Sequence, residues 1–568
     1  MKLFAKYFCK SALSMKSNII ILFLLSLLSS FMYFFVQISI DGNLEYLNSK
    51  AVLTNVEKEF LVSLQSNQTL AITFLVMLTL ITAFVYFMFY KKYCSLHQKE
   101  LGCYISLGYS TKKMALIILL ISIILNFIAN ICGLYLGWIG SEVMLGLYKD
   151  VYSLDYLVKG IYIQNYSIAL LCSFLPAISV IMIFEKMNKE DTIDFLDANN
   201  NMNTFHVGIF SRILSKFLSF SMRLALRKPF QIFISILSVG IFATLFIMSF
   251  SLNLSSQYIF DTQSHGRNYQ YDVSYPVYQT VHQDYEKFEY YIKDNIKIES
   301  NGKKINGSIM GIENSKGLFF LTDERGSQID NIPTNNVVVS EALSVLYDIQ
   351  KGTDINVRLN NMEISLRVYD IAQNADNYSI YTSKSNLEKL LNLSQNSYNG
   401  VYTNNITEIP EIGTAHIQNI SERIDKLEEN NVSNRISAII CQILGCVIGC
   451  LLLYLTILLK FQEDTKNIFI LDMMGYTAKK INKMFISVYR PILNIAFIIL
   501  LIPSIEICKF IHKSLSLSTN DYIPFQCNIF VILFIFILLN LLYTIIKFLF
   551  NSRISRIQKK DITLRYLN

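Results

Sequence analysis

Charged residues are scarce in this chain. Asp, Glu, Lys and Arg make up 16% of its 568 residues, whereas 52% are hydrophobic. About a quarter of the residues in an ordinary soluble protein are charged, so the composition predicts a membrane protein. The net charge of +7 is concentrated in particular loops. It therefore points to membrane topology and does not indicate nucleic-acid binding.

Cysteine is absent from Asn253 to Asn434, the one stretch that is long and polar enough for a sizeable soluble domain. No disulfide framework is therefore expected in that stretch. Elsewhere, Cys446 and Cys450 stand four residues apart in an apolar segment. Small residues at this helical spacing favour close packing over a metal site.

Motifs for nucleotide binding and catalysis are also missing. No GxxxxGK[ST] phosphate loop occurs, and the six histidines show neither HExxH nor a Cys/His zinc spacing. The apolar segments carry Ser, Asn and Thr rather than the Asp, Glu or His chains of ion-coupled transporters. We therefore expect no enzymatic activity, no metal site and no cofactor in this chain, and an energy source in another protein.

Eight apolar segments are present that could cross a bilayer, which needs about 20 residues per helix. The first follows a basic leader like a signal peptide, but no small-residue cleavage pattern follows it, so we interpret it as a retained helix. The eight segments begin near Ile19, Leu70, Met114, Ser167, Phe230, Ile436, Phe485 and Ile529.

Lys and Arg cluster in every second connection between these segments. Intervening loops such as Asp41–Gln68 contain few basic residues. By the positive-inside rule, the basic connections and both termini lie in the cytoplasm, and residues 253–434 lie outside. The basic segments are 1–18, 91–113, 186–229, 460–483 and 551–568.

A repeated motif relates the two halves of the chain. Leu107-Gly108-Tyr109 is followed by Lys112-Lys113, and Met474-Gly475-Tyr476 is followed by Lys479-Lys480. The segments that precede the first span of each half, Lys10–Lys16 and Arg223–Lys228, also correspond. Because both copies enter the membrane from the same side, they predict parallel repeats packed about an axis along the membrane normal.

The expected fold is an α-helical polytopic membrane protein with eight spans in two parallel four-helix repeats, plus a mixed α/β extracytoplasmic domain. The predicted order is an amphipathic leader 1–18, a first repeat 19–185 with a short outer loop 39–69, a cytoplasmic linker 186–229, a fifth span 230–252, the outer domain 253–434, three spans in 435–550 and a basic tail 551–568.

The linker contains a predicted amphipathic helix at the membrane surface. Its basic face consists of Arg212, Lys216, Arg223 and Arg227, and its other face is apolar. Such a helix binds membrane lipids, and simple anchoring and a role in coupling stay open as alternatives.

Two GxxxG pairs occur within predicted spans. They are Gly133 with Gly137 and Gly445 with Gly449. Glycines at this spacing let helix backbones approach closely, and we expect packing inside a bundle rather than dimerisation.

The outer domain shows both strand and helix patterns. Strands are predicted at Asn268–Tyr275 and Asn336–Ser340, and a hairpin at 354–368 around Asn360-Asn361. Helices are predicted at Asp284–Ile296, after a capping box of Ser385 and Glu388, and from Ile417 to Arg435 as a stalk into the sixth span.

The order of span, insert and three further spans, with Gln98–Gly102 leading to Leu107–Tyr109, resembles the FtsX-like permeases of ABC transporters. Val337–Leu343 and Lys351–Asp354 look like the MacB-type core domain, although Thr353 splits its glycine–aspartate pair. Two repeats with a large second insert are most similar to the bacitracin and antimicrobial-peptide resistance branch.

This resemblance implies a permease that works with a separate cytoplasmic ABC ATPase dimer, where ATP and Mg²⁺ bind. Asn467 stands where Glu100 stands in the first copy, so the contacts to the ATPase are expected to be asymmetric. The implied contact residues are Glu100, Leu101, Gly102, Leu107, Gly108, Tyr109, Lys112 and Lys113 in the first repeat, and Asn467, Met474, Gly475, Tyr476, Lys479 and Lys480 in the second.

The leading functional hypothesis from the resemblance is mechanotransmission in a bacterial cytoplasmic membrane. ATP hydrolysis by the partner would move the outer domain to export, remove or sense an antimicrobial peptide or a lipid-linked substrate, with a sensor histidine kinase as a candidate partner. One alternative is an FtsX-type regulator of a cell-wall hydrolase without substrate transport. Another is a membrane receptor or scaffold without nucleotide coupling.

Overall fold

The computed structural model describes most of the chain and divides it into two compact units. One contains Met1–Met248, Cys441–Ile507 and Asn528–Asn568, and the other contains Ser249–Ile440 and Cys508–Cys527. The predicted interfacial helix with Arg212, Lys216, Arg223 and Arg227 lies outside the described residues. The residues not described are 1–3, 5, 9, 12–15, 153, 155, 188–228, 281–287, 301–302, 314–316, 360–361, 406–414, 520–521 and 558–568.

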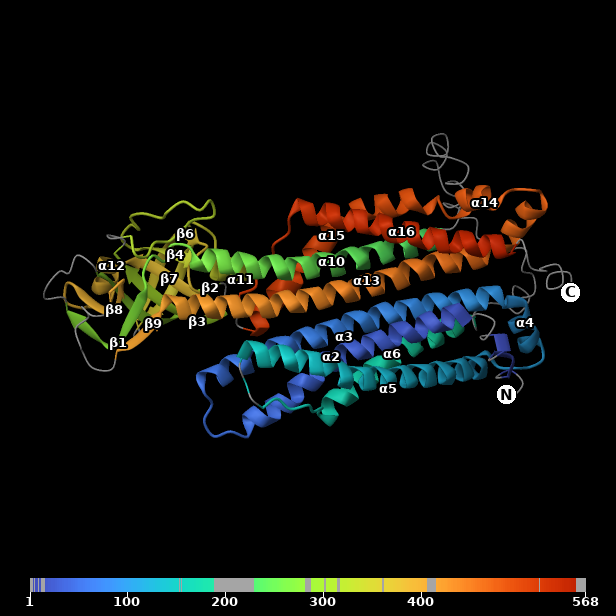
Figure 1. The fold of residues 1–568 in the computed structure, drawn as a ribbon, viewed down its shortest axis with the longest axis horizontal. Helices are drawn as coiled ribbons and strands as arrows, with labels where there is room; N and C mark the ends of the chain where they lie inside the picture. Colours follow the sequence, from blue (N-terminus) through green and yellow to red (C-terminus); the bar gives the residue numbers. More distant parts are fainter. Residues whose placement is uncertain are drawn as a thin grey trace. The chain divides into compact units, whose positions relative to one another are not determined.

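Four long helices form the first repeat and lie side by side (Figure 1). They are α2 (Lys16–Asn48), α3 (Asn55–Leu96), α5 (Thr111–Tyr152) and α6 (Ile163–Met187), with the short α4 (Gln98–Ser106) between α3 and α5. Helices are the form expected here, because an apolar bilayer leaves each backbone N–H and C=O to be paired within its own segment. Thr54 caps α3 by a capping box with Glu57.

Four further long helices belong to the second repeat, with one short helix between them. They are α10 (Pro229–Ser264), α13 (Ile420–Met473), α14 (Ala478–Phe485), α15 (Tyr489–Thr519) and α16 (Ile529–Ile557). Aromatic rings join them in pairs. Phe497 of α15 lies 5.5 Å from Phe536 of α16, and Tyr454 of α13 lies 5.4 Å from Phe550 of α16, between ring centroids.

Seven helical segments within the described residues are long and apolar enough to cross a membrane, and they coincide with seven of the eight predicted spans. The predicted span that begins near Ile436 falls within α13, where the described residues give only the shorter apolar segment Gly445–Leu455. An eighth span there stays a prediction, and so do the predicted domain boundaries.

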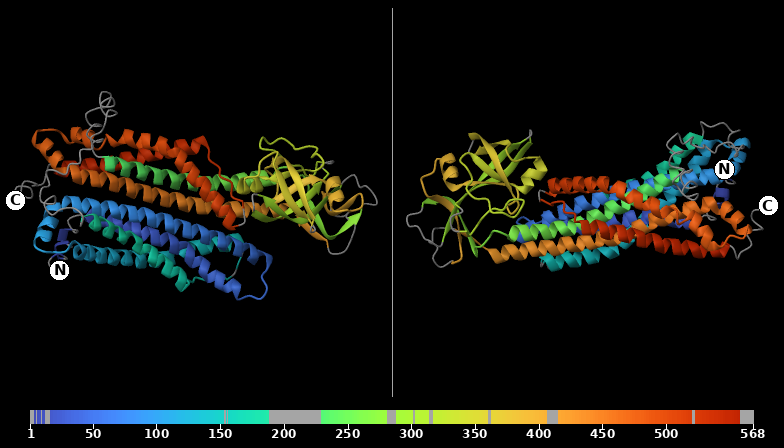
Figure 2. Two further views of the ribbon diagram at one scale, coloured as in Figure 1. Left: turned by 180° about the vertical axis from the view of Figure 1, so that it is seen from behind. Right: turned by 90° about the horizontal axis from the view of Figure 1, so that it is seen from above.

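A mixed sheet with two short helices forms the domain between α10 and α13, which we call the sheet domain (Tyr271–Asn419; Figure 2). Six of its strands, in the order β3-β7-β4-β6-β5-β2, close into a ring because β2 also pairs with β3. β2 continues into β8, β1 and β9. The strands are β1 (Tyr271–Thr280), β2 (Glu289–Ser300), β3 (Lys303–Ile312), β4 (Asn336–Ser340), β5 (Asp354–Leu359), β6 (Met362–Ala372), β7 (Ser379–Ser383), β8 (Ser397–Thr403) and β9 (His416–Asn419).

The core of the sheet domain consists of aliphatic side chains from the ring of strands and from α11 (Glu341–Tyr347) and α12 (Lys384–Leu390). Val337 and Val339 of β4 and Leu343 of α11 are completely buried. Burial of such a side chain contributes about 1.5–3 kcal/mol, so α11 is held to the sheet chiefly by its apolar face.

Several local predictions in this domain are confirmed. The strand at Asn336–Ser340 is β4, and the predicted hairpin is formed by β5 and β6, with Leu359 opposite Met362. The strand predicted at Asn268–Tyr275 overlaps β1, which begins at Tyr271 and continues to Thr280. A mixed α/β domain is therefore correct.

Three details of that domain were predicted wrongly. Residues 289–296 belong to strand β2 and not to a helix, because Ile292 and Ile296 fall on one face in either geometry, while the buried Ile298 fits only the alternation of a strand. A cap at Ser385 would start the helix at Asn386, but α12 begins two residues earlier, at Lys384, and its N-cap Ser383 makes no side-chain cap. The stalk helix begins at Ile420, because Ile417 lies in β9.

Candidate functional site

The repeated Gly-Tyr motif forms the same turn in both halves. Gly108 has φ = +86° and Gly475 has φ = +84°, in the left-handed region that glycine adopts without strain. The N–H of Tyr109 donates to the carbonyl of Tyr104 at 3.0 Å, and the N–H of Tyr476 donates to that of Leu471 at 3.0 Å. A hydrogen bond from the N–H of residue i to the carbonyl of residue i−5 is typical of the Schellman motif at the end of a helix. We call residues 104–111 and 471–478 the two glycine turns.

The helix after each glycine turn begins in the same way. The carbonyl of Ser110 accepts the N–H groups of Lys113 and Met114 at 3.0 and 3.1 Å. The carbonyl of Thr477 accepts those of Lys480 and Ile481 at 2.9 and 3.0 Å. The two turns are therefore equivalent in backbone conformation as well as in sequence.

Both glycine turns expose an apolar side chain and two lysines. Leu107 is 73% exposed and Met474 is 67% exposed, directly before the glycines. Lys112 and Lys113 are exposed, and so are Lys479 and Lys480. An apolar tip next to two positive charges is suited to contact another protein, because it combines apolar burial with electrostatic attraction.

The other predicted contact residues differ in exposure. In α4, Glu100 is exposed, whereas Leu101 and Gly102 are buried. Tyr109 is half-buried against Tyr104, and Tyr476 is 38% exposed. The backbone of Asn467 lies within α13, and its side chain is outside the described residues. The predicted asymmetry at this position stays a prediction.

The helices around the two glycine turns are interrupted at different places. In the first repeat the break comes before the turn, at His97 between α3 and α4. In the second repeat α13 runs unbroken to Met473, and the break comes after the turn, at residues 486–488 between α14 and α15. Residues of the leader contact the first break, since Tyr7 Oη lies 3.3 Å from His97 Nδ1 and Ser11 Oγ lies 3.3 Å from His97 Nε2.

The predicted GxxxG glycines lie where helices approach each other. A Cβ atom at Gly133 would come within 2.7 Å of the Ser30 Cβ, and one at Gly137 within 2.6 Å of the Phe34 Cβ, both on α2. A Cβ at Gly449 would overlap the Phe242 ring of α10. At Gly445 the nearest atoms are 3.5 Å away, which is ordinary contact.

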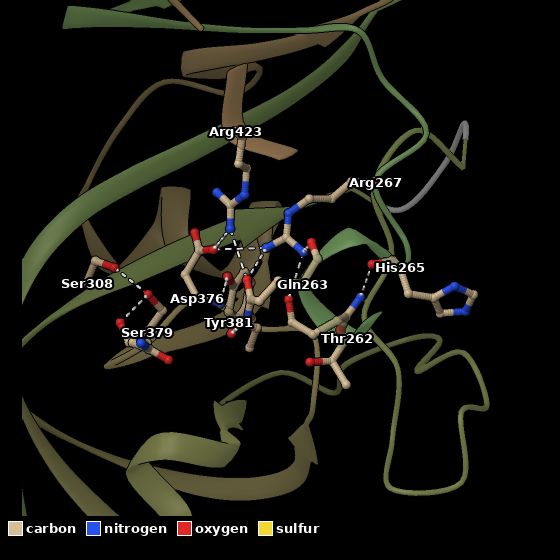
Figure 3. Close-up of polar contacts among 12 residues, drawn as sticks. Thr262, Gln263, His265, Arg267, Ser308, Asp376, Ser379, Tyr381 and Arg423 are labelled. Atoms are coloured by element: carbon tan, nitrogen blue, oxygen red, sulfur yellow. Dashed lines mark hydrogen bonds and ion pairs between the residues drawn. The ribbon is translucent and has the colours of Figure 1, made fainter. Parts of the chain in front are cut away.

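A buried cluster of charged groups lies where α10 and α13 meet the sheet domain (Figure 3). Asp376, in the loop between β6 and β7, accepts from Arg267 Nη2 at 2.9 Å and from Arg423 Nη2 at 2.8 Å, both on its Oδ1. Gln263 of α10 accepts from the same two arginines, at 3.3 and 2.9 Å. One carboxylate and one amide thus join α10, α13 and the sheet domain, and we call these four residues the stalk joint.

Arg267 is the most buried member of the stalk joint. Its side chain is 2% exposed, compared with 30% for Asp376 and 26% for Arg423. Its Nη1 donates to the carbonyls of Gln263 and Asn374 at 2.7 and 3.0 Å, and its guanidinium lies 5.5 Å from the centre of the Phe319 ring. Burial alone would raise the pKa of Asp376, but the charges of Arg423 and Arg267 hold it well below its usual range.

An extended segment precedes the last helix of each repeat. We call them the straps: the first is Tyr156–Tyr162 before α6, and the second is Tyr522–Asn528 before α16. Three residues before α6, the N–H of Gly160 donates to the carbonyl of Ile38 on α2 at 3.1 Å. Three residues before α16, the N–H of Gln526 donates to Ser251 Oγ on α10 at 3.2 Å. Each strap thus lies against the first helix of its own repeat.

A second pair of bonds strengthens this correspondence. The carbonyl of Val158, five residues before α6, accepts from Asn43 Nδ2 of α2 at 3.2 Å. The carbonyl of Pro524, five residues before α16, accepts from Ser255 Oγ of α10. The parallel duplication is thus visible in the straps, where the two sequences are dissimilar.

Asp41 fastens the first strap. Its buried carboxylate accepts from Gln37 Nε2 at 2.7 Å, from the N–H of Tyr162 at 2.9 Å and from Asn165 Nδ2 at 2.8 Å. Gly42 and Gly160 are close enough that a Cβ on either would meet the backbone of the other segment. In the part of the chain that the structure describes, no three His, Cys, Asp or Glu side chains are grouped to hold a metal ion.

Comparison with known families finds two matches within this chain, both to the family described as FtsX-like permease C-terminal. They cover residues 72–187 and 439–559. The same family thus matches once in each repeat, from α3 to α6 and again from α13 to α16. Each repeat therefore contains a region similar to the C-terminal domain of FtsX-like permeases. The chain is a multi-pass membrane protein with a mixed α/β domain inserted after the first helix of its second repeat.

Solved structures add a resemblance to a periplasmic domain. The chain matches the periplasmic region of MacB from Actinobacillus actinomycetemcomitans at 12% sequence identity, over 30% of this chain and 98% of that one, with a TM-score of 0.21. A TM-score this low does not establish a shared fold. No curated protein sequence matches the chain.

The stalk joint and the Asp41 cluster were missed by the sequence reasoning. Arg267 and Asp376 are more than a hundred positions apart, and no spacing rule connects them. A weak signal existed for Asp41, since a carboxylate directly after a long apolar segment is rarely left without partners. The sequence analysis placed Asp41 in the outer loop 39–69, whereas α2 continues through Asp41 to Asn48.

Proposed function

We propose that this FtsX-like permease couples ATP hydrolysis by a separate cytoplasmic ATPase dimer to movement of its sheet domain. The family consists of transport components, and FtsX-like and MacB-like permeases work with cytoplasmic ABC ATPases. The observation that carries the proposal is the equivalence of the two glycine turns in backbone conformation, exposed apolar tip and lysine pair. A dimeric ATPase offers two equivalent surfaces, and this chain offers two equivalent turns.

The proposal places the glycine turns in the cytoplasm and the sheet domain outside a bacterial cytoplasmic membrane. Support comes from the lysines near the turns, because basic residues stay on the cytoplasmic side. Glu100, Leu101, Gly102, Leu107, Gly108, Tyr109, Lys112 and Lys113, and their counterparts from Asn467 to Lys480, would then contact or position the ATPase.

Movement would pass from the turns to the sheet domain along helices. α10 and α13 each contribute residues to both compact units. α13 is continuous from the stalk joint at Arg423 to the second glycine turn at Met474. A continuous helix resists bending, so a displacement at one end is carried to the other. This arrangement supports mechanotransmission rather than passage of a substrate through the helices.

The substrate that we propose is an antimicrobial peptide or a lipid-linked molecule at the outer surface, which the sheet domain removes, exports or senses. The two-repeat layout with one large insert, similar to bacitracin-resistance permeases, supports this class. A sensor histidine kinase would join the complex if the role is sensing. Regulation of a cell-wall hydrolase is the outcome to expect if deletion changes cell shape but leaves peptide susceptibility unchanged.

Substitution of the turn glycines tests the coupling. A Cβ atom added at Gly108 or Gly475 meets no atom within 4 Å, but the left-handed conformation costs a residue with a Cβ about 1–2 kcal/mol. In the complex reconstituted with its ATPase, we expect Gly108→Val and Gly475→Val to reduce substrate-stimulated ATP hydrolysis. Gly108→Asn and Gly475→Asn are the matched controls, because Asn tolerates this conformation. Equal stimulation in the Val and Asn variants would remove the basis for the assigned role.

A further inference from the structure

The second strap contacts the sheet domain as well as α10. Tyr522 is 7% exposed and belongs to the same apolar cluster as Leu343 and Leu346 of α11. Its hydroxyl donates to Glu341 Oε1 at 3.1 Å. Tyr258 of α10 donates to the other carboxylate oxygen, Glu341 Oε2, at 2.9 Å. One carboxylate thus joins the strap, α10 and the first residue of α11.

The far end of α11 is held from the same part of the chain. α11 ends at Tyr347, and the next residue, Asp348, is its C-cap and has a left-handed conformation with φ = +57°. Lys513, near the end of α15, lies 3.0 Å from Asp348 Oδ1. The segment that leads from α15 into the strap therefore contacts α11 at both of its ends.

The strap is short and is itself held in place. The N–H of Ile523 donates to Ser516 Oγ of α15 at 2.9 Å, and the carbonyl of Pro524 and the N–H of Gln526 bind Ser255 and Ser251 of α10. The His512 ring meets the Phe525 ring edge to face, 5.5 Å between centres. With Ile523 held by α15 and Pro524 held by α10, we expect Tyr522 to move together with these helices.

From these contacts we infer that the second strap is a third mechanical connection to the sheet domain, in which Tyr522 and Tyr258 clamp Glu341 so that α11 follows the movement of α15. This inference rests on the proposed function. Glu341, Tyr258 and Tyr522 are positioning residues, and we call the three the strap clamp. The domain is then driven by α15 through α11 as well as by α10 and α13 through the stalk joint.

The first strap supplies the contrast that supports this assignment. Its carboxylate, Asp41, lies on the first helix of the repeat and binds the strap and α6. In the second repeat the carboxylate lies on the inserted domain, and the first helix and the strap supply the donors. The second strap therefore contacts the inserted domain in addition to the first helix of its repeat.

Amide hydrogen exchange in the full complex with its ATPase tests the clamp. Exchange in α11 is compared between the nucleotide-free state and an ATP-bound state held by a hydrolysis-deficient ATPase. We expect ATP to change exchange in α11, and we expect Tyr522→Phe and Glu341→Gln to remove most of that change. Tyr369→Phe, on an exposed tyrosine of the same domain, should keep the full change. Retention of the full change in both clamp variants would overturn the inference.

A double-mutant cycle on the chain without the ATPase tests the contact itself. Loss of one hydrogen bond to a carboxylate should speed α11 exchange by roughly tenfold. If Tyr522 and Glu341 act together, the variant with both Tyr522→Phe and Glu341→Gln should exchange little faster in α11 than either single variant. Additive effects would contradict the clamp.

The experiment also separates this inference from the proposed function. Suppose that ATP changes exchange in the sheet domain of the unaltered complex, and that the clamp variants show the same change in α11. In that case only the clamp is wrong. If ATP changes exchange nowhere in the sheet domain of the unaltered complex, the coupling function and the clamp both fall. Folding of each variant is checked by exchange in β4 and β6 without nucleotide, which should match the unaltered chain.

Discussion

The two repeats keep the same glycine turn and the same strap, and they differ in what lies at the other end of the bundle. In the first repeat, α2 continues to Asn48, and Asp41 fastens the strap to the bundle. In the second, α10 leads into the sheet domain, and charged or hydrogen-bonded groups fasten α10, α13 and the strap to that domain. The two repeats therefore share the turn that we propose contacts the ATPase, and the second repeat also carries the domain that we propose is moved.

Loss of Asp376 should have the largest effect. Asp376→Asn leaves Arg267 and Arg423 adjacent without a counter-charge, at a cost of about 2–4 kcal/mol. Amide exchange in β7 should become much faster, while the emission of Trp138 in the first repeat stays unchanged. Asp348→Asn removes an exposed pair with Lys513 and should cost under about 1 kcal/mol. Equal effects of the two variants would contradict the stalk joint.

The equivalent test of the first repeat is Asp41→Asn. The substitution removes a carboxylate that accepts from Tyr162, Asn165 and Gln37, and about 1–3 kcal/mol is expected for the donors left unpaired. Trp138 is the only tryptophan and lies under Lys159 of the first strap, so acrylamide quenching of its emission should rise. Glu142→Gln removes only an exposed partner of Lys159 and is the control. Unchanged quenching in Asp41→Asn would show that the strap is held by other contacts.

Close packing of α2 and α5 should distinguish Gly133 from glycines that have room for a methyl group. Gly133→Ala places a methyl group 2.7 Å from the Ser30 Cβ and 2.9 Å from the backbone nitrogen of Phe31, and overpacking of this kind costs about 1–3 kcal/mol. Gly445→Ala meets only ordinary contacts, and Gly146→Ala meets nothing within 4 Å, so both should be neutral or stabilising. Thermal unfolding of the purified chain measures the difference, and a loss of stability in Gly146→Ala would contradict this assignment.

The pH dependence of the sheet domain should show the smallest effect. Because the two arginines lower the pKa of Asp376 in the folded chain, the stability from this carboxylate is present above the ordinary Asp value of about 4. It is lost as the pH falls through the lower folded pKa. The protection of β7 against amide exchange, relative to the intrinsic exchange rate at each pH, should therefore fall on acidification, and Asp376→Asn should lack that component. An identical pH profile in the variant would contradict the charge assignment.

The features predicted correctly from sequence depend on local patterns. Long apolar segments define the seven predicted spans that the described residues contain. The strand at Asn336–Ser340 is a short apolar run between turn residues. Such signals are complete within about twenty residues, so a single sequence contains them.

The features that were missed depend on contacts between distant segments. The stalk joint brings together Arg267 and Asp376, which are 109 positions apart in the sequence. Tyr522 and Glu341 are 181 positions apart. β2 was predicted as a helix because Ile292 and Ile296 satisfy both periods, and pairing with β3, β5 and β8 decided between them. Contacts between distant segments and strand pairing cannot be deduced from the spacing of residues within a short segment.

Site-specific photo-crosslinking from Leu107 and Met474 tests the central claim, that the two glycine turns contact the same ATPase dimer, most directly. A photoreactive residue is introduced at either position, and at the exposed Tyr369 of the sheet domain as the control. We expect Leu107 and Met474 to give adducts with the same phosphate-loop ATPase, and Tyr369 to give none with it. Adducts from only one turn, or from neither, would contradict the account of a duplicated permease that presents two equivalent turns.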